Sequence, residues 1–274
     1  MPELPEVETI RRQLNKEIRG KKIEKITIRE SRPLKVSKEK FISAVKGAKI
    51  KEVGRRAKLL LLYLSNDRVL MFHLKMTGRM LLVGKKDLPT KHTHVIFEIS
   101  GKQNLFFEDY RKFGFIKLFK ENELEGYFAK EGYGPEPLSE DFTYKIMKMC
   151  LLAQSKKKIK QVLMEQSCVA GIGNIYASEI CFYARVKPDR RVADISESEL
   201  KNIFKGTKKI LNAAIESRGT SADAYLDAYG KQGEFVPKLK VYGREGKKCV
   251  RCRGVIKKEK LGGRGTFWCP SCQR

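Results

Sequence analysis

The sequence Cys249-Val250-Arg251-Cys252, followed after residues 253–268 by Cys269-Pro270-Ser271-Cys272, decides how the end of this chain folds. Two cysteine pairs at this spacing are typical of tetrahedral zinc sites with four thiolate ligands. Such a site has no open coordination position, so it predicts a structural zinc ion rather than a catalytic one. Four unligated surface thiols are the alternative, and they would not require this spacing.

The segment around these cysteines is short and strongly basic. Residues 238–274 contain 12 Lys and Arg against 2 Glu, a local net charge of +10. Val255-Ile256 and Phe267-Trp268 are predicted to form a β-hairpin that turns at 262–265, with Arg264 at its tip. A tail of this size buries too little surface to fold alone, so zinc is expected to supply much of its stability.

The region before this tail has a helical period. Gly134-Pro135-Glu136-Pro137 is predicted to be a linker, and 219–233, rich in Gly, Ser, Ala and Asp, is predicted to be a mobile loop. Between them the apolar spacing predicts four helices. They run from Ser139 to about Leu152, from Ile159 to Gln166, onward from Gly171-Ile172-Gly173, and onward from Ser196, where Ser196 and Glu199 have capping-box spacing.

The apolar pattern of the first half of the chain predicts one helix followed by strands. Leu4, Val7, Ile10, Leu14 and Ile18 recur at helical steps, whereas residues 22–118 contain short apolar runs separated by turns. This order predicts an α+β protein with an N-terminal helix and a β-sandwich. The predicted domains are 1–133 (the sandwich), 134–237 (helical) and 238–274 (the zinc-binding hairpin).

Charge is the outlier of the composition. The chain has 58 Lys and Arg against 32 Asp and Glu, a net charge of +26 with a pI of about 9.8. This imbalance predicts a polyanionic partner, nucleic acid before an acidic membrane. The longest apolar run, Leu59–Leu64, is far shorter than the roughly 18 residues of a membrane span. No secretory signal is recognised at the start, so we expect a cytosolic protein in which Cys150, Cys168 and Cys181 are buried packing residues.

The N-terminus holds residues that suit covalent chemistry. Removal of Met1 would leave Pro2 with a free secondary amine, and an α-amine titrates near pH 7.7–8.0, at about neutrality. Such an amine is nucleophilic, and Glu3 or Glu6 could serve as a general acid beside it. On composition alone, a structural role is the better interpretation of Pro2, Glu3 and Glu6, because prolines and acidic residues commonly begin helices.

A family resemblance changes that balance. Six stretches, in order along the whole chain, resemble the bacterial formamidopyrimidine-DNA glycosylases, the 8-oxoguanine repair enzymes. They are Met1–Thr9, Arg55–Lys58, His73–Gly78, Asp109–Gly114, Val169–Tyr176 (the helix–two-turn–helix signature) and Gly263–Thr266 in the zinc finger. Each alone is a modest signal, but their colinear order is specific.

The resemblance implies a bifunctional glycosylase and lyase that acts on damaged double-stranded DNA. It would flip out an oxidised purine, cleave the glycosidic bond and nick the strand by β- and δ-elimination. Pro2 would attack C1′ of the nucleoside to form a Schiff base, and Glu3 would be the general acid. Lys58 and Arg264 match the residues that assist β- and δ-elimination. A guanidinium hardly deprotonates, so Arg264 is better suited to gripping a phosphate.

Other matched residues are implied to contact DNA. Glycine-permitted amides at 171–174 open a helix and form an anion site for a phosphate. Met76, Arg111 and Phe113 resemble the family's wedge, which fills the gap left by the flipped base. The full implied set is Met76, His92, Arg111, Phe113, Lys156, Asn174 and Tyr176.

Simpler structural roles compete with several of these assignments. Met76 and Phe113 beside strands are ordinarily core residues, and the lysines of 156–160 ordinarily form a solvated basic face. His73 in an apolar strand is predicted to be a satisfied core histidine. The colinear resemblance favours DNA contact for Met76, Phe113 and Lys156, but not for His73.

The chain also departs from the family pattern. Thr93 replaces the usual Asp between His92 and His94, which predicts a looser loop, and Lys112 replaces a common second arginine. The lid segment Ser221–Tyr225 is atypical and leaves the preference among oxidised purines open.

Two other functions compete with purine excision. An endonuclease VIII-type enzyme acting on oxidised pyrimidines is disfavoured by Leu4, where that branch has glycine. A non-catalytic DNA-binding zinc protein would not need Pro2, Glu3 and Lys58. We expect a monomer with no membrane association, acting in the bacterial cytoplasm at the nucleoid.

Overall fold

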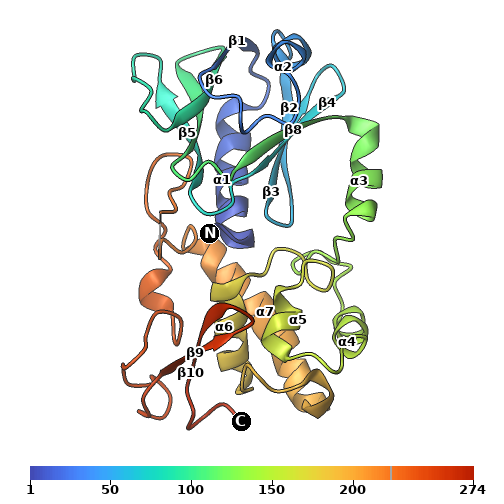
Figure 1. Ribbon diagram of the computed structural model, residues 1–274, viewed down its shortest axis with the longest axis vertical. Helices are drawn as coiled ribbons and strands as arrows, with labels where there is room; N and C mark the ends of the chain where they lie inside the picture. The colour runs from blue at the N-terminus through green and yellow to red at the C-terminus, as the bar shows by residue number, and fades with distance from the viewer. Residues whose placement is uncertain (223) are drawn as a thin grey trace. The chain divides into compact units, whose positions relative to one another are not determined.

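The computed structural model describes residues 1–222 and 224–274, and its chain forms two compact units (Figure 1). Unit 1 comprises Met1–Glu131 and Ser217–Glu234, and unit 2 comprises Gly132–Glu216 and Phe235–Arg274. The segment Ser217–Glu234 therefore belongs with the N-terminal residues, although it follows the helical region in sequence. The boundaries after 133 and after 237 stay predictions. Asp223, within the lid segment, lies outside the described residues.

Unit 1 begins with helix α1 (Leu4–Ile18), as the period predicted. Its apolar stripe, including Leu4, Ile10 and Ile18, is completely buried. Pro5 lies in the first turn, where its missing N–H has no helical partner to lose. Gly20, two residues past the end, has a φ of +80°, a conformation that glycine adopts without strain.

Two four-stranded antiparallel sheets form the predicted β-sandwich of unit 1. One sheet has the order β1-β6-β7-β5 and the other β2-β3-β4-β8. Leu60, Leu62 and Leu64 of β3 belong to one core cluster together with residues of α1 and the first sheet. The strands are β1 (Ile23–Ile28), β2 (Ile50–Arg56), β3 (Leu59–Leu64), β4 (Arg68–His73), β5 (Gly78–Gly84), β6 (Thr93–Ile99), β7 (Gln103–Asp109) and β8 (Phe115–Lys120).

Two short helices of unit 1 were not predicted. They are α2 (Lys38–Val45) and α3 (Leu124–Lys130). Ser37 caps α2 by accepting a hydrogen bond from the Lys40 amide, and only Phe41 and Val45 of this helix are buried. A helix of two turns with two buried residues carries too little periodicity to be distinguished from a loop.

The predicted mobile loop is anchored to unit 1 through its described residues. Gln13 of α1 donates from Nε2 to Asp227 Oδ2 at 2.9 Å and accepts the Ala228 amide at Oε1, also at 2.9 Å. Arg79 of β5 donates from Nε and Nη2 to the Ala224 carbonyl at 3.0 and 2.8 Å. These contacts hold the middle of the segment, at Ala224, Asp227 and Ala228. Thr220, Tyr225, Asp227 and Ala228 of this segment are buried, and its polar composition could not reveal such distant partners.

Unit 2 contains four main helices, as predicted, with some boundaries shifted. Helix α4 begins after Thr143, whose side chain caps Ile146, rather than after Ser139. Ser196 and Glu199 form the predicted reciprocal cap of α7, with the Ser196 amide 2.8 Å from Glu199 Oε2. The helices are α4 (Tyr144–Leu152), α5 (Ile159–Met164), α6 (Asn174–Ala184) and α7 (Glu197–Glu216). Among the described residues, no helix has the length and apolarity needed to cross a membrane.

The C-terminal hairpin forms, but with a different first strand. Strands β9 (Lys257–Leu261) and β10 (Arg264–Trp268) pair antiparallel, so the charged run replaces Val255-Ile256 as partner of Phe267-Trp268. Gly262 and Gly263 make the two-residue turn with φ of +57° and +76°. This turn needs positive φ at both positions, which favours glycine and fixes the register.

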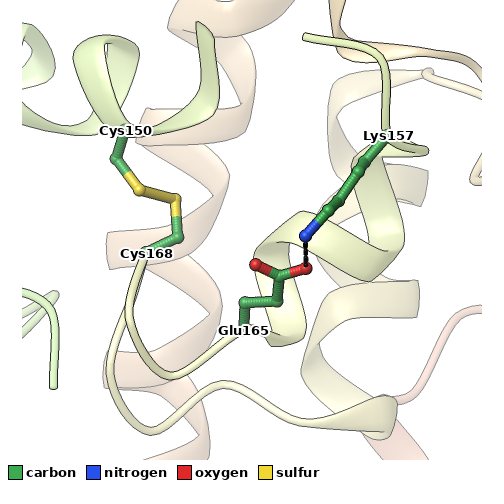
Figure 2. The surroundings of a disulfide bond; sticks show 4 residues. All are labelled: Cys150, Lys157, Glu165 and Cys168. Atoms are coloured by element: carbon green, nitrogen blue, oxygen red, sulfur yellow. Dashed lines mark hydrogen bonds and ion pairs between the residues drawn. A yellow bond between two sulfur atoms is a disulfide. The ribbon is translucent and has the colours of Figure 1, made fainter. Parts of the chain in front are cut away.

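Two cysteines expected to be packing residues instead form a disulfide, Cys150–Cys168 (Figure 2). Their Cα atoms lie 5.4 Å apart, and Cys168 lies in the turn after α5 rather than on a helix. Helical spacing could not predict this pairing because only one partner is helical. Cys181 is a free buried thiol as predicted, and burial raises its pKa to about 12.

Candidate functional site

The residues just before α1 are fixed and buried. Glu3 is 2% exposed, and its amide donates to Glu6 Oε2 at 2.8 Å. The other oxygen of Glu6 accepts the Thr220 amide at 2.8 Å, which ties the N-terminus to the segment Ser217–Glu234. Pro2 is also buried. Ends of chains usually fray, so an N-terminus held this firmly indicates a specific role.

Lys58 lies in a tight turn next to α1. Arg56 pairs with Leu59, so Ala57 and Lys58 alone connect β2 to β3, and Ala57 has a φ of +52°. Arg55 donates from Nε to Glu8 of α1 at 3.1 Å and from Nη1 to the Ala57 carbonyl at 2.9 Å. Arg55 therefore links the turn to α1. Lys58 itself is buried, with 8% of its surface exposed.

Glu8 joins three arginines at this junction. Arg11, Arg12 and Arg55 lie 2.8, 2.8 and 3.1 Å from its carboxylate oxygens. Burial acts to raise the pKa of Glu8, but hydrogen bonds from Arg11 and Arg12 and the nearby positive charges outweigh it and hold the pKa below 4.5. A carboxyl group with a lowered folded-state pKa stabilises the fold above its unfolded pKa, and this contribution disappears as pH falls through the folded value.

We therefore expect Glu8→Gln to lower the free energy of unfolding by about 2 kcal/mol at neutral pH, since charged hydrogen bonds are lost. The difference from wild type should shrink as pH falls below 4.5, where the unfolded chain's Glu8 takes up a proton. Urea unfolding of both proteins at neutral and acidic pH measures this. Glu39→Gln, at an exposed site in α2, is the matched control and should change little. Equal pH dependence of wild type and Glu8→Gln would contradict the assignment.

His73 is a neutral histidine, in agreement with its predicted structural role. Burial and the charges of Lys75 and Lys58 lower its pKa to about 3. Its Nδ1 accepts the Lys75 amide at 3.0 Å. This contact shapes the turn that leads to Met76.

Asp109, which sequence reasoning missed, organises the loop between β7 and β8. It is fully buried and accepts the amides of Arg111 (3.1 Å, at Oδ1) and Gly114 (2.7 Å, at Oδ2). Thr77 donates to the same carboxylate at 2.5 Å and accepts the Arg111 amide at 3.0 Å. A Cβ at Gly114 would lie 3.1 Å from Asp109 Oδ2 and 3.0 Å from the Phe107 ring, so a larger residue there would require these neighbours to shift by a few tenths of an ångström.

This arrangement brings the three predicted wedge residues onto two linked loops. Phe113 is 56% exposed and Met76 37% exposed, which excludes the alternative that they are core residues. The Arg111 guanidinium carbon lies 4.8 Å from the centre of the Phe113 ring. Two solvent-facing apolar side chains and a cation, fixed by buried hydrogen bonds, can enter the stack of a nucleic acid without first ordering themselves.

His92 is connected to the same loop. Its ring lies 4.0 Å from that of Tyr110 between centroids, and its carbonyl accepts the Asp109 amide at 3.0 Å. Thr93, expected to loosen this region, instead donates to Glu108 at 2.6 Å and accepts the Thr90 amide at 3.0 Å. The Thr93 hydroxyl therefore both donates and accepts here, and a looser loop than one with Asp stays a prediction.

In unit 2 a buried lysine joins helix and hairpin. Lys160 is 1% exposed, and its Nζ donates to Asn174 Oδ1 at 2.5 Å and to Thr266 Oγ1 at 2.8 Å. Asn174 donates from Nδ2 to the Gly265 carbonyl at 3.0 Å, next to exposed Arg264. The expectation that Lys160 belongs to a solvated face was wrong, whereas Lys156 is exposed. The structure thus brings Asn174 and the Arg264 hairpin together.

The glycine turn before α6 is also built by side-chain contacts. Gly171 has a φ of +89°, and its amide donates to Gln166 Oε1 at 2.9 Å. Gln166 Nε2 donates in turn to the Ile172 carbonyl at 2.9 Å. Tyr176, one of the predicted DNA-contact residues, is fully buried against Phe235. A contact from Tyr176 to DNA would therefore have to use its main chain.

The four predicted zinc ligands lie in one cluster. Their Sγ atoms are all within 4.8 Å of one another, with Cys249–Cys272 at 3.8 Å and Cys252–Cys269 at 3.4 Å. A zinc ion about 2.3 Å from four tetrahedral sulfurs separates them by about 3.8 Å, so the residues fit zinc. The Arg251 amide points at Cys249 Sγ from 3.4 Å, as expected for a charged thiolate.

The sequence matches known families over nearly all of its length. Residues 1–116 match the formamidopyrimidine-DNA glycosylase N-terminal domain and 133–225 the H2TH domain of the same glycosylases. Formamidopyrimidine-DNA glycosylases of Carboxydothermus hydrogenoformans and Streptococcus mutans are 44% and 41% identical, with complete coverage of both chains. The chain belongs to the formamidopyrimidine-DNA glycosylase family.

Solved structures of this glycosylase family share the fold. A complex of Lactococcus lactis Fpg with DNA containing an abasic site has a TM-score of 0.94 at 38% identity, covering 99% of each chain. A complex of the same organism's enzyme with DNA containing N7-benzyl-Fapy-dG has a TM-score of 0.93 at 37% identity, covering all of both chains. Residues 246–274 match the zinc finger found in FPG and IleRS, which agrees with the four-cysteine cluster.

Proposed function

We propose that this chain is a base-excision repair enzyme that removes oxidised purines, such as 8-oxoguanine and formamidopyrimidines, from duplex DNA and then nicks the strand. Its relatives carry the name formamidopyrimidine-DNA glycosylase, and the related solved structures hold DNA with lesions or abasic sites. The observation that carries the proposal is the firm burial of Pro2 and Glu3 at the start of α1. The contact between Glu3 and Glu6 is a capping box that begins α1, whereas helix initiation does not require Pro2 and Glu3 to be buried.

Excision starts from Pro2 once Met1 has been removed. Its ring nitrogen attacks C1′ of the damaged nucleoside, the glycosidic bond breaks toward the base, and Glu3 is the general acid of this step. The nitrogen then loses its one proton, and the sugar ring opens as the C1′–O4′ bond breaks and O4′ takes up a proton. The open-chain product is an iminium ion, because the nitrogen of a secondary amine has no second proton to lose. Its positive charge acidifies the C2′ proton, and loss of that proton expels the 3′ phosphate. Glu6 positions Glu3, because its carboxylate accepts a hydrogen bond from the Glu3 amide.

Lys58 and Arg264 serve the elimination steps. Lys58, held in the β2–β3 turn by the link from Glu8 through Arg55, donates a proton during β-elimination. Arg264 grips the phosphate that leaves in δ-elimination, since a guanidinium binds phosphate in two places but rarely gives up a proton. Hydrolysis of the iminium then releases the enzyme.

DNA is held by residues of both units. Met76, Arg111 and Phe113 fill the gap left by the flipped nucleotide. Their contacts offset the free energy of unpairing and unstacking one base, which is about a few kcal/mol. His92, Lys156 and Asn174 bind the DNA backbone, and the main-chain amides around Asn174 donate hydrogen bonds to a phosphate at the helix start. Tyr176 contributes its main chain. One zinc ion, held by the four cysteines, has no open position and supplies stability to the hairpin.

The proposal is tested with three labelled duplexes that contain 8-oxoguanine, an oxidised pyrimidine or no lesion. We expect strand nicking at 8-oxoguanine with phosphate at both new ends, which is the signature of two successive eliminations. Faster nicking at the oxidised pyrimidine would favour the endonuclease VIII-type alternative. Tight binding to the lesion with no nicking would establish the non-catalytic alternative and overturn the proposal.

Binding to DNA should depend steeply on salt. The net charge of +26 and exposed cations such as Lys156 and Arg264 provide several phosphate contacts. Each contact contributes a slope of about −0.9 in log affinity against log salt, so a total slope steeper than about −3 is expected. Anisotropy titrations over a salt series measure it, and a flat dependence would contradict electrostatic binding. Lys156→Gln should reduce the slope by about 1.

The enzyme is further proposed to act as a monomer, in the cytoplasm at the nucleoid. A DNA substrate supports the location, and the family supports the monomer. Domain boundaries after 133 and 237 remain part of this proposal.

A further inference from the structure

Unit 2 contains a pocket of about 540 Å³ whose lining includes none of the predicted catalytic, DNA-contact or zinc-ligand residues, although the amide of its lining residue Arg251 contacts Cys249 Sγ. It lies between α6, α7 and two stretches of the C-terminal chain, and this volume is within the range of ligand-binding pockets. Its apolar wall includes Phe182, Ile210, Phe235 and Val250. Val250 is 56% exposed, so this wall opens to solvent.

The charged residues that line the pocket are four cations and one acid. Lys209, Lys238, Lys240 and Arg251 all line it. Glu179 is the only acid among its described lining residues, and its carboxylate accepts the amides of 240, 241 and 242, each at 2.9 Å. The negative charge is therefore already engaged by the main chain, and the pocket presents an excess of positive charge.

Two of these cations are held over the apolar wall. The Arg251 guanidinium carbon lies 4.2 Å from the Phe182 ring centre, and its Nη1 donates to the Phe182 carbonyl at 3.0 Å. Lys209 Nζ lies 5.6 Å from the ring centre of Tyr183. Apolar surface and cations are thus presented together rather than in separate patches.

We propose that this pocket binds a short acidic peptide segment of a partner protein, with one bulky apolar side chain inserted and carboxylates on the surrounding cations. The cations come from α7, from residues 238–240 and from Arg251 between Cys249 and Cys252. Because these segments are separate, the cations match several carboxylates along a peptide better than one small anion. A DNA duplex offers phosphates but keeps its bases stacked, and so would leave the apolar wall uncovered. The inference goes beyond the repair reaction and does not depend on it.

The test measures binding of a fluorescein-labelled peptide of Asp and Glu residues that ends in Leu-Phe. A control peptide ends in Ala-Ala and keeps the same charge. At an ionic strength of about 0.15 M, where weak surface attraction is screened, the Leu-Phe peptide should bind at least about tenfold more tightly. Equal affinity for both peptides would reduce the interaction to attraction by the net charge and overturn the proposal.

Three variants locate the binding. Ala213→Phe fills the pocket, and Lys209→Gln removes one lining charge; each should weaken the Leu-Phe peptide several-fold, with thermal unfolding and DNA nicking unchanged. Lys208→Gln is the matched control, because Lys208 is adjacent on α7 but lies over Phe204 instead of the pocket. Unchanged peptide binding in both Ala213→Phe and Lys209→Gln would overturn the proposal. So would displacement of the peptide by undamaged duplex, since the site would then be part of the DNA surface.

Discussion

Replacing Pro2 by glycine is expected to slow excision and nicking of 8-oxoguanine duplex by at least about a hundredfold. Proline's ring holds its nitrogen in one orientation, whereas glycine gives a flexible primary amine that must be ordered in every reaction. The buried contacts of Glu3 and Glu6 continue to hold the helix start, so the fold should be unaffected. The loss would therefore be chemical rather than structural.

Borohydride trapping gives the direct measurement. Reduction during turnover converts the iminium into a stable amine, so wild type should form a covalent protein–DNA adduct. Pro2→Gly should form little, and a protein with one extra residue ahead of Pro2 should form none, because its nitrogen is acylated. Pro5→Ala is the matched control: it removes a proline from the first turn of α1 without touching the amine.

Mass spectrometry of the active protein completes this test. The mature chain should lack Met1, and peptide mapping of the trapped adduct should place the DNA on Pro2. Full activity with Met1 retained, or an adduct on Lys58, would contradict the proposed nucleophile.

Local patterns predicted much of the fold. The cysteine spacing placed four sulfurs in one cluster because both pairs sit in tight turns that fix their own geometry. The predicted helix forms at Leu4–Ile18 and the predicted strand at Leu59–Leu64. Both could be predicted because the spacing of apolar residues along a short stretch of sequence shows which side chains are buried. The glycines at 262–263 fixed the hairpin turn, although not which residues preceded it.

Distant partners could not be predicted in this way. Lys160 lies in a lysine-rich run that looks solvated, and its partner Thr266 is 106 residues away. Cys150 and Cys168 pair across a turn that carries no period. Asp109 reads as the polar end of a strand, yet it is fully buried and fixes the wedge loop.

The candidate site residues were predicted mainly from the family resemblance. Pro2 and Glu3 are indistinguishable by composition from an ordinary helix start. What separates them is their firm fixation, which depends on Thr220, 214 residues from Glu6 along the chain. No local signal carries that information, whereas a colinear set of motifs does.

Removing zinc is expected to unfold the C-terminal hairpin and to lower affinity for lesion duplex at least about a hundredfold. The hairpin's own core is small: Val241, Cys249, Ile256, Phe267 and Cys269 pack with Phe182 of α6. Two of these residues are themselves ligands. Structural zinc in such a fold contributes about 10–16 kcal/mol, which this core cannot replace.

The loss of binding follows from what the hairpin holds. Arg264 is carried by β10, and Thr266 and Gly265 of the same strand contact Lys160 and Asn174. Unfolding therefore removes one phosphate-binding cation and releases the side chains that order the start of α6. A tail with a net charge of +10 would still be attracted to DNA, so the lost affinity should be for the lesion site more than for bulk duplex.

The chain's single tryptophan provides a fluorescence signal that reports on the hairpin alone. Trp268 lies in β10, is 8% exposed and has Lys187 Nζ 4.8 Å from its ring centre. Chelation should shift its emission to longer wavelength while the β-sheet circular dichroism of unit 1 persists, and added zinc should reverse the shift. Cys252→Ala should behave like the chelated protein, whereas Cys181→Ala, which removes a buried free thiol outside the cluster, should keep both zinc and DNA binding. Stoichiometric zinc release with unchanged Trp268 emission would show that the hairpin folds without the metal and that its stability has another source.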